Sequence, residues 1–141
     1  MDKGQPLSKG MLGLGVFLFF GATMALLAGV TLAWPGTTLD YLWRLNPRAY
    51  LQLAPLGRPV GIAFLFLSTV MVIAGAGWFK QRIWGWWLAV GILATQCLGD
   101  LVNVFMGHPL EGLFGVTVAG ALLFYLFRPG VRSVFRQRMQ A

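Results

Sequence analysis

The sequence predicts an all-α protein, a four-helix transmembrane bundle with short amphipathic helices in its outer loop. Four apolar segments have about the 20 residues that a helix needs to cross a ~30 Å hydrocarbon core. Two of the connections between them are only three residues long, which places the helices on either side next to each other and antiparallel. Basic residues flank the apolar segments instead of interrupting them, as membrane topology requires.

The composition supports the same class. Of the 141 residues, 57% are hydrophobic and only 11% are charged, whereas a soluble domain has about 25% charged residues. We therefore expect residues 1–141 to form one integral membrane domain, in which the 19 glycines allow close helix packing. The net charge of +7 comes from residues beside the apolar segments, which indicates the lipid bilayer as partner and excludes nucleic acid.

The helices are predicted at residues 11–33, 59–79, 83–106 and 110–127, followed by a basic cytoplasmic tail at 128–141. The first segment is too long for the ~7–15-residue apolar core of a signal peptide, so it is expected to remain as a helix. The fourth segment is slightly short and should cross the membrane with little tilt.

The distribution of Lys and Arg predicts the orientation. One side of the membrane carries eight of them and the other carries three, so both termini are expected in the cytoplasm. Aromatic residues form a predicted belt at each surface, with Trp78, Trp84, Trp86, Trp87 and Tyr125 inside and Trp34, Tyr41, Trp43 and Tyr50 outside. The tail arginines are predicted to contact lipid headgroups at about 1 kcal/mol each; they are Arg128, Arg132, Arg136 and Arg138. Apolar residues between them, such as Phe135, are expected to enter the membrane interface.

The outer loop at residues 34–58 contains signals for two short helices. Thr37 or Thr38 is a candidate cap for the first, with Asp40 in its first turn. Asn46 and Pro47 have the residue types of a cap and a first helical position for the second. These helices are expected to lie in the interface or to cover the bundle as a lid.

Small residues at four-residue spacing predict where the helices approach one another closely. They form stripes in the first, third and fourth helices: Gly21, Ala25 and Gly29; Gly91, Thr95 and Gly99; Gly115 and Ala119. The partner of each stripe lies in the same chain or in another copy.

A cluster of polar residues, Asp100, Asn103, His108 and Glu111, follows the third apolar segment and is here named the polar cluster. It contains two of the four acidic residues and the only histidine of the chain. Ionisable groups near membrane depth are costly, so their presence needs a structural or functional reason.

Three interpretations of the polar cluster compete. In the preferred, structural one, Asp100 pairs with Arg58, Arg44 or Arg48, and Glu111 complements the dipole of the fourth helix. In the second, the cluster binds an ion, a headgroup or a small solute. In the third, the cluster does acid–base chemistry, or its histidine and two carboxylates bind a transition metal, although zinc sites usually have more His or Cys ligands. The prediction is no metal, no cofactor and no catalytic residue.

Three stretches resemble parts of small four-helix prokaryotic integral membrane proteins that have no assigned activity. They are residues 80–90 (KQRIWGWWLAV), 99–103 (GDLVN) and 125–135 (YLFRPGVRSVF). The resemblance covers roughly the last 65 residues. It implies the four-helix fold and a prokaryotic inner or plasma membrane, and it implies no activity.

These observations predict a non-enzymatic multi-pass membrane protein. It would serve as an accessory or structural subunit of a membrane complex, or as a homo-oligomer. The alternative is a small transport or solute- or lipid-binding protein that uses the polar cluster. A phosphate loop, a serine-hydrolase elbow and a dinucleotide fingerprint are all missing from the sequence, which argues against an enzyme.

Overall fold

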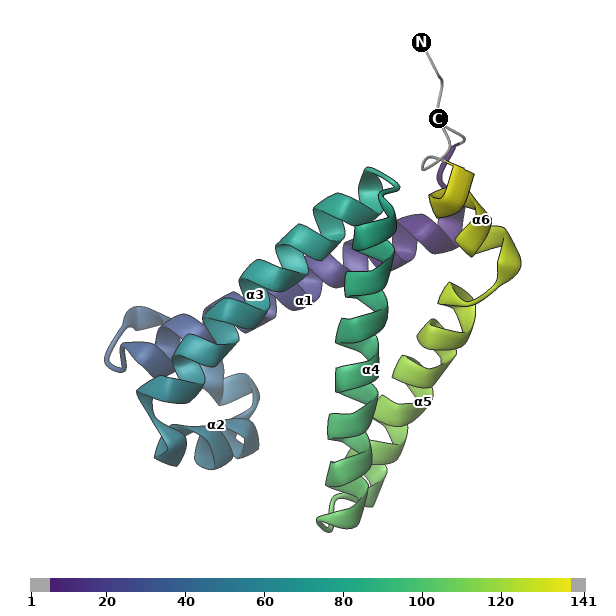
Figure 1. Ribbon diagram of the computed structural model, residues 1–141. Helices are drawn as coiled ribbons and strands as arrows, with labels where there is room; N and C mark the ends of the chain where they lie inside the picture. Colours follow the sequence, from purple (N-terminus) through teal and green to yellow (C-terminus); the bar gives the residue numbers. More distant parts are fainter. Residues whose placement is uncertain (1–5, 138–141) are drawn as a thin grey trace. The chain divides into compact units, whose positions relative to one another are not determined.

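The computed structural model describes residues 6–137, which are helical with short turns and contain no strand. Eight helical elements follow one another along this part of the chain (Figure 1). They are α1 (Lys9–Ala33), η1 (Thr38–Leu45), α2 (Pro47–Leu53), η2 (Ala54–Leu56), α3 (Arg58–Phe79), α4 (Ile83–Phe105), α5 (Pro109–Leu126) and α6 (Pro129–Gln137). The elements labelled η are 3₁₀ helices.

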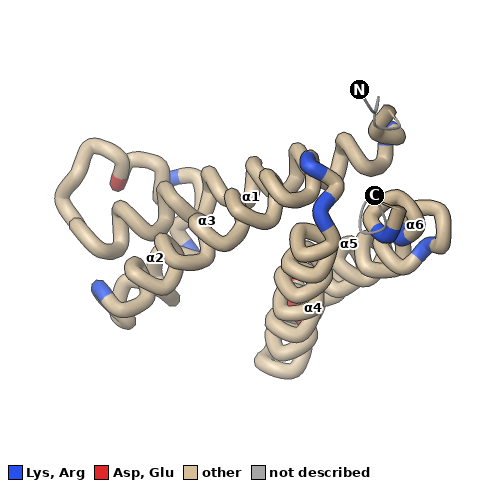
Figure 2. The backbone as a smooth tube through the Cα atoms, turned by 45° about the horizontal axis from the view of Figure 1, so that its top comes forward, with Lys and Arg blue, Asp and Glu red and all other residues tan. Residues whose placement is uncertain are grey.

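The helices α1, α3, α4 and α5 are long and apolar enough to cross a membrane. Their bounds differ from the predicted ones by one or two residues at most. Lys and Arg gather at helix ends, in the loop and in α6 rather than along the spans (Figure 2). The all-α class is confirmed for the described residues. The presence of four helices that could cross a membrane is consistent with an integral membrane protein.

The chain divides into two compact units. The expectation of a single integral membrane domain stays a prediction. The middle unit comprises residues 19–72, and the terminal unit comprises residues 1–18 together with 73–141. Helices α1 and α3 each contribute one part to either unit.

In the middle unit, α1 and α3 run antiparallel and approach closely at glycine. A Cβ atom on Gly61 would meet the backbone of Ala33 and Gly29 within 3 Å. Farther along the pair, the buried Ser68 hydroxyl donates to the Ala22 carbonyl at 2.8 Å. Part of the predicted first-helix stripe therefore packs inside this chain, because only a glycine leaves space for the opposite backbone.

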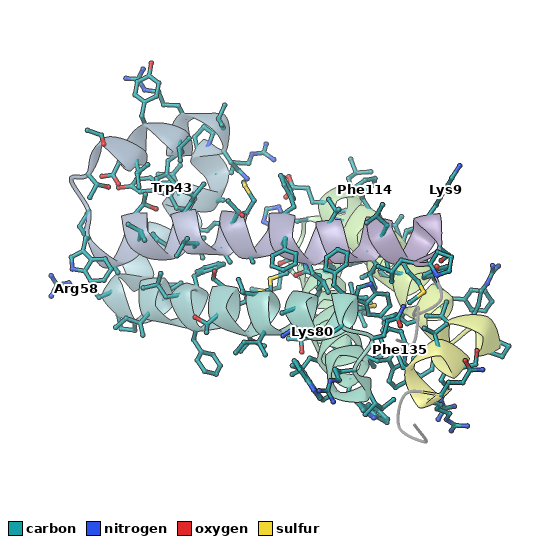
Figure 3. All side chains as sticks on the ribbon, turned by 90° about the horizontal axis from the view of Figure 1, so that it is seen from above. Lys9, Trp43, Arg58, Lys80, Phe114 and Phe135 are labelled. Carbon is teal, nitrogen blue, oxygen red and sulfur yellow. The ribbon has the colours of Figure 1, made fainter. Side chains whose placement is uncertain are left out.

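The long loop of the middle unit is held by polar contacts. The Asn46 side chain caps α2 by accepting the Ala49 N–H at 3.2 Å, as the sequence predicts. Thr37 stands at the cap of η1 without a capping bond, and the Asp40 carboxylate instead accepts the Gly36 N–H at 2.6 Å. The Trp43 indole donates to the Thr31 hydroxyl at 2.9 Å and so ties the loop to α1 (Figure 3).

In the terminal unit, α4 and α5 pack side by side (Figure 1). Gly107 makes the turn between them with φ +97°, a conformation that favours glycine. A Cβ atom on Gly112 would meet the Asp100 carbonyl and Val104 within 3 Å. The two helices can approach this closely because position 112 has no side chain.

Two tryptophans of the predicted aromatic belt lie in the core of the terminal unit instead. Trp78 and Trp86 are 0% and 1% exposed. The Trp78 indole donates to the Met11 carbonyl at 2.7 Å, and the Trp86 indole donates to the Leu126 carbonyl at 3.1 Å. Since each N–H has a protein acceptor, these rings do not need water or headgroups. Of the four tryptophans predicted on the inner side, Trp84 and Trp87 keep substantial exposure.

Residues 129–137 of the predicted basic tail form α6, and its apolar face is buried in protein. Phe135 is 0% exposed, with its ring 4.8 Å from that of Trp78, and Val131 is also buried. The expectation that Phe135 enters the membrane interface is therefore wrong. The spacing of Val131 and Phe135, one helical turn, places both on one face toward the core.

Candidate functional site

All members of the polar cluster belong to the terminal unit. Asp100 is half-buried near the end of α4, whereas Asn103, His108 and Glu111 are exposed. Glu111 lies in the first turn of α5, where a carboxylate complements the positive end of the helix.

The Asp100 side chain lies over α5 and contacts its own helix. Among the described residues, the Gln96 amide donates to this carboxylate, with its nitrogen 3.1 and 3.3 Å from the two carboxylate oxygens. A Cβ atom on Gly115 would overlap the carboxylate, so this glycine makes room for Asp100. Sequence reasoning missed Gln96, although its position four residues before Asp100 puts both on one face of α4.

The arginines predicted to pair with Asp100 belong to the middle unit, where each has another contact. Arg58 Nε donates to the Ala33 carbonyl at 3.1 Å, and the Arg44 guanidinium lies 4.1 Å from the centre of the Tyr41 ring. Arg48 is exposed in α2. A pair between Asp100 and one of them stays a prediction.

The predicted headgroup-binding arginines lie in and just before α6. Arg132 and Arg128 sit near aromatic rings, 5.7 Å from Trp86 and 5.9 Å from Phe124, and Arg136 is exposed in the last turn. Arg138, like Lys3 on the same predicted side, lies outside the described residues.

The donor set for a metal is not assembled in residues 6–137, where no three His, Cys, Asp or Glu side chains form a group. Cys97 is a half-buried free thiol. The third interpretation of the polar cluster gains no support from this geometry.

One face of α4 is exposed and carries small and polar residues. We name it the open face of α4; it consists of Gly91, Thr95, Gln96, Gly99 and Asn103. A Cβ atom on Gly91 or Gly99 would meet nothing within 4 Å. The predicted third-helix stripe therefore has no neighbour at these two positions among the described residues of the terminal unit.

A second feature, a pocket of about 270 Å³, lies in the middle unit between the long loop and the ends of α1 and α3. We name it the loop pocket; its lining residues are Thr31, Leu32, Pro35, Tyr50, Ala54, Gly57 and Arg58. The sequence predicts a loop that covers helix ends, but it gives no sign of this space, because the pocket forms only when α2 and η2 fold back toward α1 and α3.

Comparison with known proteins adds no relative. The chain matches no family, and it shows no significant similarity to a curated protein or to a solved structure.

Proposed function

We propose that this chain is a non-enzymatic membrane protein that serves as an accessory or structural subunit of a larger assembly. The open face of α4 is the surface that meets a transmembrane helix of the partner. The observation that carries this proposal is that polar side chains and bare glycines share an exposed face on a helix long enough to span a membrane.

Hydrogen bonding distinguishes one pair of side chains, Gln96 on the open face and Asp100 beside it, from the threonines of the spans. The threonine hydroxyls on the spans donate to carbonyls of their own helix, for example Thr95 to Gly91 at 2.8 Å and Thr117 to Leu113 at 2.7 Å. Gln96 and Asp100 have no such internal solution, because a carboxylate and an amide oxygen accept more bonds than their mutual contact supplies. A partner helix with donors would satisfy them away from water.

The glycines of the open face explain how a partner could approach. Without a Cβ at positions 91 and 99, the backbone of a second helix can come near and gain van der Waals contact. A lipid tail packs less closely against such a surface than a rigid helix does, and it loses conformational entropy there. The open face therefore favours protein over lipid as its neighbour.

The open face suits a different protein and also a second copy. The side-chain amides of Gln96 and Asn103 both donate and accept hydrogen bonds, so they can pair with either neighbour. The homo-oligomer is the other outcome that the test below distinguishes.

Association is tested with the full chain extracted in mild detergent from its native membranes and weighed by native mass measurement. We expect a complex with a second protein. Gly91→Leu should reduce the recovered partner about tenfold or more, because overpacking costs of 1–3 kcal/mol apply to a close interface. Gln96→Leu should also reduce the amount of recovered partner, because it removes a hydrogen-bonding side chain from the open face.

Gly13→Leu is the matched control, because Gly13 is an exposed span glycine whose Cβ would also meet nothing within 4 Å. It should leave the partner bound. A monodisperse monomer without partner contradicts the proposal, and a complex of identical chains assigns the homo-oligomer. If Asp100→Asn abolishes a solute-dependent stability shift instead, the solute-binding alternative holds.

The proposed orientation places both termini in the cytoplasm and the long loop outside. It is tested with Leu45→Cys and Lys9→Cys in a Cys97→Ala background, since Leu45 is 85% exposed and Lys9 is exposed. An impermeant maleimide should label position 45 in intact cells and position 9 only after lysis. The reverse pattern would invert the topology.

A further inference from the structure

The loop pocket combines the cationic side chain of Arg58, which is exposed, with apolar walls. Arg58 is the first residue of α3, and its side chain extends from the helix end (Figure 3). Its Nε donates to the Ala33 carbonyl at 3.1 Å, which leaves the terminal nitrogens as donors among the described residues. Leu32, Pro35 and Ala54 supply apolar surface, and Tyr50 adds a phenol.

The electrostatics of the middle unit favour an anion. Three arginines and one aspartate within residues 19–72 give +3 − 1 = +2. The Asp40 carboxylate is occupied by the Gly36 N–H and the Thr37 hydroxyl, and Asp40 does not line the pocket. The start of the 22-residue α3 also contributes the positive end of its helix dipole.

The size and surroundings of the pocket select the kind of anion. Its 270 Å³ is close to the lower limit of about 300–1,000 Å³ for ligand pockets, which suits a headgroup rather than a large solute. Arg58 begins a span, so it lies at headgroup level when α3 crosses a membrane. Leu56 and Ile62, close to it in the chain, are 57% and 60% exposed and offer apolar surface for acyl chains.

We propose that the loop pocket binds the phosphate of an anionic phospholipid headgroup, with the Arg58 guanidinium as its principal ligand. Guanidinium and phosphate form two parallel charge-assisted hydrogen bonds, which a zwitterionic headgroup weakens through its own cation. Free phosphate can form the same hydrogen bonds, but it has no acyl chain to contact the exposed Leu56 and Ile62. The inference is independent of the partner proposed for α4, because it rests on residues of the other unit.

The test uses the full chain in nanodiscs of phosphatidylcholine, with and without phosphatidylglycerol. Native mass measurement counts retained lipids, and thermal unfolding reports stabilisation. We expect retained phosphatidylglycerol and a raised unfolding temperature. Arg58→Gln should lower the affinity for phosphatidylglycerol about tenfold, because bonds to charged groups contribute affinity of that order.

Arg44→Gln is the matched control, since it removes the same charge from the same loop but lies on Tyr41 rather than in the pocket. It should keep the preference for phosphatidylglycerol. Ala54→Leu fills the pocket without a change of charge and should displace the lipid even if Arg58→Gln fails to fold.

Three results would overturn the proposal. Equal losses in Arg44→Gln and Arg58→Gln would show general charge attraction, and unchanged binding in Ala54→Leu would place the lipid elsewhere. Stabilisation by inorganic phosphate alone, without any effect of phosphatidylglycerol, would identify the free anion as the ligand.

Discussion

Trp78→Ala is expected to lower the free energy of unfolding by about 3–5 kcal/mol, as truncation of buried aromatic residues does. Trp78 is 0% exposed and touches Phe135 of α6 with its ring. Its indole N–H also donates to the Met11 carbonyl at 2.7 Å. The substitution leaves a cavity and removes the donor from a buried acceptor, so two penalties act together.

The purified chain is unfolded in detergent, and its helix content is monitored by far-UV circular dichroism. This readout does not rely on tryptophan fluorescence, which the substitution itself would change. Trp87→Ala is the control, because Trp87 is 59% exposed and lies edge-on to Trp86 at 4.8 Å. It should cost less than half as much as Trp78→Ala. Equal effects of the two substitutions would mean that Trp78 acts as a surface anchor, as the sequence alone predicts.

The position of Trp78 shows where sequence reasoning reaches its limit. A tryptophan beside basic residues at the end of an apolar segment fits a membrane-surface belt and also a buried ring with a protein acceptor. The choice depends on whether a carbonyl from another helix is in reach, here that of Met11, 67 positions earlier. No local pattern contains that information.

The helices themselves were predictable because their signals are local. Apolar length sets the spans, and the Asn46–Pro47 pair sets the start of α2 through capping and a proline at the first helical position. The same logic applies to α6, which begins at Pro129. A proline also starts helices, and Val131 with Phe135 one turn later gave the signal for a buried face.

The candidate sites were predictable only in part, because they depend on contacts between helices. Asp100 is conspicuous in the sequence, but its place over Gly115 requires the α4–α5 pairing. Gly91 and Gly29 both belong to predicted stripes, yet one faces open space and the other meets Leu65. The four-residue spacing therefore does not distinguish glycines that pack against another helix of this chain from glycines that do not.

Gly85→Ala is expected to cost about 1–3 kcal/mol or more, because added atoms in a packed contact force the backbone to move. A Cβ at this position would overlap the Gly77 backbone and come within 3 Å of the Trp78 nitrogen. Neither can rotate away, unlike the end of a side chain. The α3–α4 hairpin would have to open at this contact, next to the core around Trp78.

Gly120→Ala separates this steric cost from helix propensity. Gly120 is an interior residue of α5, where alanine gains roughly 0.5–1 kcal/mol from reduced backbone entropy, and Gly85 lies in the first turn of α4, where the gain is no larger. A Cβ on Gly120 would meet nothing within 4 Å, so only this gain applies there. We expect the two variants to shift the unfolding midpoint in opposite directions. If Gly85→Ala is also stabilising, α3 and α4 are not in backbone contact at Gly77, and the glycine there has no packing role.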